Sequence, residues 1–212
     1  MDEIILIGGG GNSKKIIDIV IENGYHIRGI LDDKYNNNII EYYRNIKIID
    51  KISNINNYKN CGIVVTIGDI NFRKSFFIIY NNLNYINVIS KKSNISPTVS
   101  LGKGIVIHHC VNIGPDVSIG DFSHIDTNAN IEHDTLIGNN CLICPGVIIC
   151  GHSTINNNAF IGAGTVIKDS TNTKKIIIDN DVIIGAASVI TKSISKNMIY
   201  YGSPLNYITK NI

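Results

Sequence analysis

Tryptophan is absent from this 212-residue chain, prolines number only four, and charged residues make up only 17% of it. So few prolines beside 19 glycines exclude a proline-rich linker or a collagen. The hydrophobic fraction of 44% excludes a disordered chain. A formal net charge of +2 provides no basic footprint for nucleic acid or an anionic membrane, so we expect neither partner. The length allows one large domain or two small ones.

Long hydrophobic runs and a secretory signal are also missing. The first apolar run, residues 4–7, stops at four glycines, and no stretch approaches the length of a membrane span. The five cysteines, an odd number, fit free thiols in a reducing compartment, so we expect a cytoplasmic protein. Cys141 and Cys144 match C-x-x-C, but they fall at different positions of the repeat described below, which favours packing over zinc binding.

Residues 1–91 alternate between strand and helix patterns. Expected strands cover residues 3–7, 27–31, 46–49, 62–67 and 86–89, with helices ending at Asn23-Gly24 and covering 71–82. This order predicts a parallel sheet with helices packed on it, a Rossmann-like α/β domain. Ligands bind such sheets at the carboxyl ends of the strands, where Gly8 to Gly11, Asp32-Asp33 and Gly68-Asp69 fall.

The glycine run of this domain allows two interpretations. Its backbone N–H groups could approach a phosphate at the start of the following helix. However, Gly8-x-Gly10-x-x-Ser13 lacks the third glycine of the dinucleotide fingerprint, and no P-loop lysine follows. From the pattern alone, a nucleotide site and a plain tight turn remain equal alternatives.

The second half of the chain, residues 92–212, has a six-residue period. Ile or Leu anchors recur at 95, 101, 107, 113, 119, 125, 131, 137, 143, 149, 155, 161 and 167, and resume at 178, 184 and 190. A small or β-branched residue follows each anchor by four places, and glycine often follows directly. This period is typical of a parallel β-helix with three hexapeptides per coil. We expect the glycines after the anchors to occupy tight corners.

Each coil also presents one side chain outward, and several of these are apolar. They are Leu136, Leu142, Ile148, Phe160, Val166, Ile183 and Val189. Exposed on a single prism they would form an extended apolar patch, which favours burial against partner subunits over surface scatter. Three-faced prisms pack readily about a threefold axis, so we predict a homotrimer.

His133 is the candidate for chemistry, because Asp134 follows it and a nearby carboxylate strengthens an imidazole as a base. His152 falls roughly one coil further along the same face and could line the same groove. We interpret His26, His108 and His124 as solvated or interface residues, and His109 remains intermediate. The histidine intervals do not fit the three-histidine zinc sites of some β-helices, so we expect no metal.

In its order of motifs, the chain resembles the bacterial sugar acyltransferases of the NeuD/PglD type over essentially its whole length. The motifs lie at residues 7–14, 29–33, 67–74, 131–134 and 202–204. The resemblance implies a left-handed β-helix at 92–212 behind a sugar-nucleotide domain at 1–91. It also implies transfer of acetyl from acetyl-CoA to the amine of a UDP-4-amino-4,6-dideoxy sugar.

The same resemblance implies roles for individual residues. His133 would be the general base, supported by Asp134. Contacts to the UDP part would come from Gly10, Gly11, Asn12, Asp32, Asp33 and Gly68. The acetyl-CoA channel between subunits would be lined by Leu142, Ala163 and Ala186. Asn12 stands where the family commonly has His, and an insertion at residues 169–175 interrupts a late coil. Acetylation of a sugar hydroxyl, as on a sialic-acid-type acceptor, and a non-catalytic scaffold are the alternatives.

Overall fold

The structure is a computed structural model that describes residues 3–36, 42–195 and 198–209. The chain divides into two compact units, Met1–Lys91 and Lys92–Ile212. Within the described residues, no helix has the length and apolar character needed to cross a bilayer.

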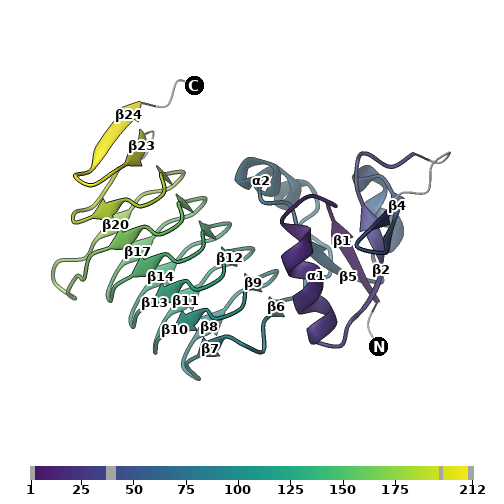
Figure 1. Ribbon diagram of the computed structural model, residues 1–212, viewed down its shortest axis with the longest axis horizontal. Helices are drawn as coiled ribbons and strands as arrows, with labels where there is room; N and C mark the ends of the chain where they lie inside the picture. The colour runs from purple at the N-terminus through teal and green to yellow at the C-terminus, as the bar shows by residue number, and fades with distance from the viewer. Residues whose placement is uncertain (1–2, 37–41, 196–197, 210–212) are drawn as a thin grey trace. The chain divides into compact units, whose positions relative to one another are not determined.

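The first unit is built on a mainly parallel sheet with the strand order β3-β4-β2-β1-β5 (Figure 1). Its elements are β1 (Glu3–Ile7), α1 (Ser13–Glu22), β2 (His26–Leu31), β3 (Tyr42–Tyr43), β4 (Ile46–Asp50), the 3₁₀-helix η1 (Ile52–Tyr58), β5 (Gly62–Val65), α2 (Ile70–Ile79) and β6 (Val88–Ile89). Strand β1 pairs in parallel with β2 and β5, and β2 with β4, while β3 is antiparallel to β4. The apolar runs form these strands because both faces of a parallel sheet are covered.

Three expected elements of this unit differ from the structure by more than one residue at an end. The strand expected at residues 62–67 ends at Val65, and the hydroxyl of the next residue, Thr66, donates to the carbonyl oxygen of Ile7 at 2.8 Å. The strand expected at residues 86–89 is only Val88–Ile89, and it lies outside the order of the first sheet. The second helix, expected at residues 71–82, covers Ile70–Ile79. It starts one residue early because the Asp69 carboxylate caps it by accepting the N–H of Phe72 at 2.7 Å.

The second unit is a left-handed parallel β-helix whose two-residue strands form three faces. Face 1 holds β7 (Asn94–Ile95), β10 (Asn112–Ile113), β13 (Asn130–Ile131), β16 (Ile148–Ile149), β19 (Val166–Ile167) and β22 (Val189–Ile190). Face 2 holds β8 (Ser100–Leu101), β11 (Ser118–Ile119), β14 (Leu136–Ile137), β17 (Thr154–Ile155) and β20 (Ile177–Ile178). Face 3 holds β9 (Val106–Ile107), β12 (His124–Ile125), β15 (Leu142–Ile143), β18 (Phe160–Ile161) and β21 (Ile183–Ile184), continued by β23 (Met198–Tyr201) and β24 (Asn206–Thr209).

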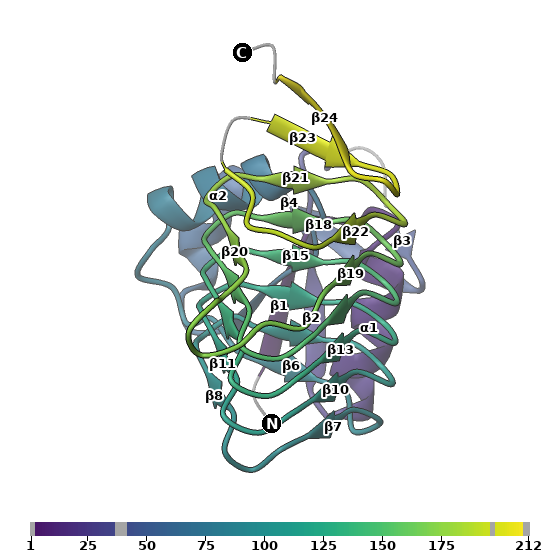
Figure 2. The same ribbon diagram turned by 90° about the vertical axis from the view of Figure 1, so that its left-hand side faces the viewer.

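The six-residue period explains this architecture. Each anchor pairs with the anchor of the next coil, as Ile131 does with Ile113 and Ile149. Figure 2 shows β15, β18 and β21 stacked as successive rungs of face 3. From residue 105 onward, the anchors and the small or β-branched residues between them are buried, so the core is a column of isoleucines filled in by residues such as Ala129 and Cys141. Cys141 therefore packs inward and Cys144 is half-buried, and both are free thiols.

The glycines that follow the anchors do not form the corners, contrary to the expectation from sequence. The left-handed backbone falls three residues after most anchors instead, for example at Asp134 with φ 56° and Gly146 with φ 67°. Glycine after an anchor serves close stacking of coils: a Cβ on Gly162 would lie 2.5 Å from the backbone nitrogen of Ala186. The left-handed positions are held mostly by Asn, Asp or Gly, so glycine occurs at both kinds of position.

The insertion predicted in a late coil is a loop between β19 and β20. Coil pairing joins residues 18 apart up to this point, but Thr154 pairs with Ile177, five residues later than the period requires. The extra residues form a short turn in which Thr171 and Lys174 pair. The β-helix therefore keeps its cross-section and carries the insertion as a projection at the corner between face 1 and face 2.

Candidate active site

His133 and Asp134 lie in the corner that follows β13, between face 1 and face 2. Asp134 occupies the left-handed position of the turn, and its N–H bonds to the carbonyl oxygen of Pro115 in the preceding coil at 3.1 Å. The turn directs both side chains outward, where about half of each is exposed. His133 Nδ1 lies 2.8 Å from Asp134 Oδ2, a hydrogen-bond distance.

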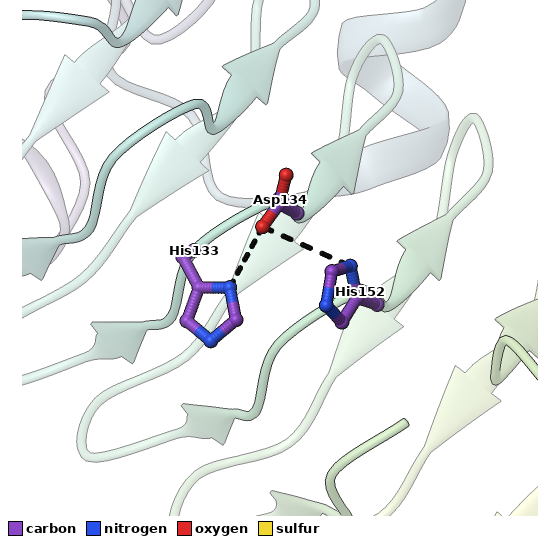
Figure 3. Close-up of side chains that lie close together, drawn as sticks. All are labelled: His133, Asp134 and His152. Carbon is purple, nitrogen blue, oxygen red and sulfur yellow. Dashed lines mark hydrogen bonds and ion pairs between the residues drawn. The ribbon is translucent and has the colours of Figure 1, made fainter. Parts of the chain in front are cut away.

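His152 occupies the same corner one coil further on, as its spacing predicts. Its N–H donates to the carbonyl oxygen of His133 at 3.1 Å, and its Nδ1 lies 3.8 Å from Asp134 Oδ2. The two imidazole rings meet edge to face with centroids 5.1 Å apart. Figure 3 shows the Asp134 carboxylate reaching toward both rings, which come from neighbouring coils. One carboxylate thus lies at hydrogen-bond distance from His133 and at ion-pair distance from His152.

Gly151 makes room for the ring of His133, a role that the sequence reading did not recognise. A Cβ on Gly151 would lie 2.9 Å from both Cε1 and Nε2 of the imidazole, closer than real Cβ contacts allow. Gly151 follows an anchor by two places, where the repeat shows no preference for glycine. Its signal in the sequence is the 18-residue offset from His133, which places the two residues one coil apart.

The electrostatics of this corner favour a proton on His133. The hydrogen bond that His133 donates to Asp134 raises the pKa of His133 above its ordinary value of 6.5, and the negative charges of Asp134, Glu132 and Asp169 act in the same direction against a desolvation effect. The same bond lowers the pKa of Asp134 below its ordinary 3.8. Asp134 is therefore ionised at neutral pH and holds Nδ1 as the protonated nitrogen. The free nitrogen, Nε2, is left to accept a proton.

These three side chains also have donor types that suit a metal ion. The ligand atoms of His133, Asp134 and His152 lie within 4.8 Å of one another. Two imidazoles and one carboxylate are a ligand set that zinc accepts. The expectation of a metal-free protein therefore stays a prediction, and activity that survives dialysis against a chelator would support it.

Two of the remaining histidines differ from the expectation in their burial. His108 and His124 are buried, with 2% and 1% exposure, so the interpretation of either as a solvated residue is wrong. His124 precedes the anchor Ile125 on β12 and pairs in register with Val106 and Leu142. His26 is exposed at the start of β2, as expected, and His109 is half-buried.

In the first unit, the glycine run connects β1 to α1 beside Asp32, which follows β2. The Asp32 carboxylate accepts the N–H of Gly9 at 2.7 Å and the N–H of Lys34 at 3.0 Å. Asp32 therefore holds the glycine turn, in addition to any contact it makes with a ligand. The next residue, Asp33, accepts the N–H of Ile52 at 3.3 Å.

The other predicted nucleotide-contact residues lie around the same turn. Asn12 Nδ2 donates to the carbonyl oxygen of Thr66 at 3.1 Å, and a Cβ on Gly68 would approach the same nitrogen at 4.0 Å. Gly10 and Gly11 are exposed and have open space where a side chain would be. The structure thus brings five of the predicted positions together at the carboxyl ends of β1, β2 and β5, while Asp33 faces the start of η1.

The three residues assigned to acetyl-CoA lie away from the His133 corner of the β-helix. Ala163 and Ala186 are exposed, and they follow β18 and β21 at the corner between face 3 and face 1. They belong to successive coils: the carbonyl oxygen of Ala163 accepts the N–H of Ala187 at 2.8 Å. Leu142 is half-buried on β15 of face 3. Within one chain, a face of the prism separates these residues from His133.

Comparison with known proteins assigns both parts of the chain. Residues 3–79 match the PglD N-terminal domain, and residues 116–151 and 134–169 match the bacterial transferase hexapeptide of six repeats. Protein L142 of Acanthamoeba polyphaga mimivirus is 41% identical over 101 residues, which are 48% of this chain. The chain covers only 20% of that relative.

Solved structures share the fold over nearly the whole chain. A variant of GDP-perosamine N-acetyl transferase from Caulobacter crescentus, in complex with CoA and GDP-perosamine, is 22% identical with a TM-score of 0.88, covering 99% of this chain and 98% of that one. The acetyltransferase domain of PglB from Neisseria gonorrhoeae FA1090 is 21% identical with a TM-score of 0.89, covering 98% and 100%. The resemblance inferred from sequence motifs is confirmed: this chain has a PglD N-terminal domain followed by a left-handed β-helix of bacterial transferase hexapeptide repeats.

Proposed function

We propose that the protein is an acetyl-CoA-dependent N-acetyltransferase that acts on the amine of a nucleotide-linked amino sugar, a UDP-4-amino-4,6-dideoxy sugar in the first instance. The observation that carries this proposal is the exposed His133–Asp134 pair, 2.8 Å apart, on a transferase β-helix in the same chain as a PglD N-terminal domain. Solved proteins of this fold bind CoA with GDP-perosamine, or acetyl coenzyme A. The choice of UDP as the nucleotide is part of this proposal.

The chemistry needs a base because a protonated amine cannot attack a thioester. The ammonium first loses one proton to water, and His133 Nε2 takes a second proton from the nitrogen as the neutral amine attacks the acetyl carbonyl carbon. The new C–N bond forms, the C–S bond breaks, and the CoA thiolate leaves with the proton returned from His133. A backbone N–H stabilises the oxyanion, and orientation of both substrates in one groove supplies the rest.

Direct transfer fits the surroundings of His133 better than an acyl-enzyme. Cys150 is the cysteine nearest in sequence to Gly151 and His152, and burial raises the pKa of its thiol. A raised pKa keeps the sulfur protonated and therefore weakly nucleophilic. The five cysteines are free thiols, which supports the proposed location in a reducing, cytoplasmic compartment.

A homotrimer is part of this proposal, because one chain places its assigned residues on separate edges. Four apolar side chains are 37–43% exposed on the two faces that meet at the His133 corner: Ile148 and Val189 on face 1, Leu136 and Ile177 on face 2. Burial of these side chains between protomers would bring the His133 corner of one subunit against a neighbour. The Ala163 corner of that neighbour could then complete the site.

The test of the proposed activity is release of free CoA thiol with candidate acceptors. We expect release with UDP-4-amino-4,6-dideoxy sugars and formation of an amide. Parallel reactions with GDP- and dTDP-linked amino sugars identify the nucleotide. Release only with hydroxyl acceptors would establish the O-acetyltransferase alternative, and no release with any acceptor would favour a non-catalytic scaffold.

Asp134→Asn is expected to lower kcat and to move the acidic limb of the pH profile of kcat/KM to lower pH. His133 must be neutral to act as a base, so the rate falls as the pH drops through its pKa, which Asp134 raises. Without the carboxylate that pKa moves back toward 6.5, so the inflection moves down. At the same time Nδ1 loses its orienting partner, which lowers the plateau. An unchanged inflection in kcat/KM between pH 5 and 9 would contradict this pairing.

Asp32→Ala is expected to raise KM for the sugar nucleotide about tenfold or more and to leave KM for acetyl-CoA unchanged. The substitution removes the acceptor of two backbone N–H bonds that hold the glycine turn. Charge-assisted bonds of this kind contribute roughly 1.5–3 kcal/mol each. Steady-state kinetics with each substrate varied measures the split. An equal rise in both KM values would contradict the assigned role of the first unit.

A further inference from the structure

The insertion after β19 forms a structured loop beside the catalytic corner. Ser170 is buried, and both its hydroxyl and its N–H bond to the carbonyl oxygen of Gly151, at 2.8 and 3.3 Å. Gly151 is the residue against which the ring of His133 packs. Further along, Thr171 and Lys174 exchange two backbone hydrogen bonds in a tight turn. The loop is thus attached to the coil that supports His133.

This loop borders a pocket with a volume of about 440 Å³. Its lining consists of Lys168, Asp169, Ser170, Thr171, Lys174, Lys175, Ile176, Thr191, Lys192 and Ser193. Four of these ten residues are lysines and one is acidic, so the lining carries an excess of positive charge. Within the described part of the chain, none of the four ammonium groups lies within ion-pair distance of a carboxylate. The pocket is therefore suited to an anion.

The pocket continues the line of the catalytic residues. His133, His152 and Ser170 follow β13, β16 and β19, three successive strands of face 1. Neighbouring strands lie about 4.8 Å apart, so the loop starts roughly 10 Å from His133 along the same corner. Charges of this loop already act on the pair: Lys175 helps to lower the pKa of Asp134, and Asp169 helps to raise the pKa of His133.

A second hollow adjoins the first and extends it toward the C-terminal hairpin. It has a volume of about 570 Å³ and shares Lys192 and Ser193 with the lysine pocket. Its lining includes Met198, Tyr200 and Tyr207 from β23 and β24. A ligand with phosphates in the lysine pocket would therefore have room for an aromatic or apolar portion beyond them.

We propose that the lysine pocket formed by the inserted loop binds the diphosphate group of a substrate of the reaction. This inference rests on the proposed function, in which CoA and the nucleotide sugar both carry a diphosphate. Lysine ammonium groups act on phosphate as point charges, and several around one pocket bind it without a single fixed geometry. The insertion thus adds a binding site two coils beyond His133 along the same corner of the β-helix.

The test is binding of CoA and of UDP, each measured by isothermal titration without turnover. Lys174→Gln combined with Lys192→Gln is expected to raise Kd about tenfold for one of the two ligands and to reduce the salt dependence of that Kd. The matched control is Lys92→Gln combined with Lys103→Gln, which removes the same charge at the other end of the β-helix. A selective loss for CoA assigns the pocket to the acyl donor, and a selective loss for UDP assigns it to the nucleotide sugar.

Unchanged Kd values for both ligands, or the same loss in the control, would overturn the proposal. So would failure of the wild-type protein to bind either ligand. Because binding is measured apart from catalysis, a protein that binds CoA through these lysines but acetylates no acceptor would refute the proposed function and leave the pocket assigned.

Discussion

Replacing His133 with alanine is expected to lower kcat by at least 100-fold while the protein stays folded. General-base catalysis contributes about 10²–10⁴-fold to such reactions, and the variant has no other side chain at that position to accept the proton. The loss should fall on kcat more than on KM, because Nε2 acts on the proton in the transition state. Folding should survive because the side chain is 48% exposed and its ring packs on a glycine.

The control for this prediction is His26→Ala, which removes an exposed imidazole from the start of β2. Thermal unfolding and the thiol-release assay are measured for both variants beside the wild type. His133→Ala with more than a tenth of wild-type kcat would remove His133 from the role of base. His152→Ala would then be the next variant, because its ring is the other imidazole that Asp134 approaches.

A mixture of two inactive variants is expected to regain about a quarter of wild-type activity. In the proposed trimer, each site combines the His133 corner of one protomer with the Ala163 corner of its neighbour. His133→Ala removes the base, and Ala163→Trp fills the other corner with a bulky side chain. When both variants are co-expressed in equal amounts and assemble at random, about one seam in four pairs an intact His133 with an intact Ala163.

This experiment tests directly whether each site is shared between two protomers. Each variant alone should retain a few per cent of wild-type activity at most, and separately purified samples mixed without exchange of subunits should stay inactive. Different affinity tags on the two variants allow the mixed assemblies to be isolated. No recovery in a mixed assembly of confirmed composition would place the whole site within one chain, and light scattering that gives a monomer would contradict the trimer itself.

The β-helix could be predicted from sequence because the geometry of its coils imposes a six-residue period on the chain. An inward side chain recurs every six residues, and the isoleucines from 107 to 167 keep that phase without a slip. The role of the glycines could not be read in the same way. Gly162 is required by contact with Ala186, which lies in the next coil beyond an insertion, so no local pattern separates it from a turn glycine.

The His133–Asp134 pair shows the same division. His133 and Asp134 are adjacent in sequence, so their interaction was open to prediction. The sequence also suggested that His152 lies one coil away, but not that Asp134 would contact both rings or that Gly151 would make space for one of them. Those facts depend on side-chain directions at a corner, which the hexapeptide period does not specify.

The amino-acid order by itself determined two domains of different construction, the isoleucine column, and the one histidine with an adjacent acid. It could do so because strand runs and the six-residue period are local properties of the chain. Only the tertiary structure decided that Asp32 holds the turn at Gly9, that His108 and His124 are buried, and that inserted lysines border a pocket along the His133 corner. Each of these depends on contacts between residues 18 or more positions apart, or on the direction of a side chain, and both are set by how the coils and strands stack.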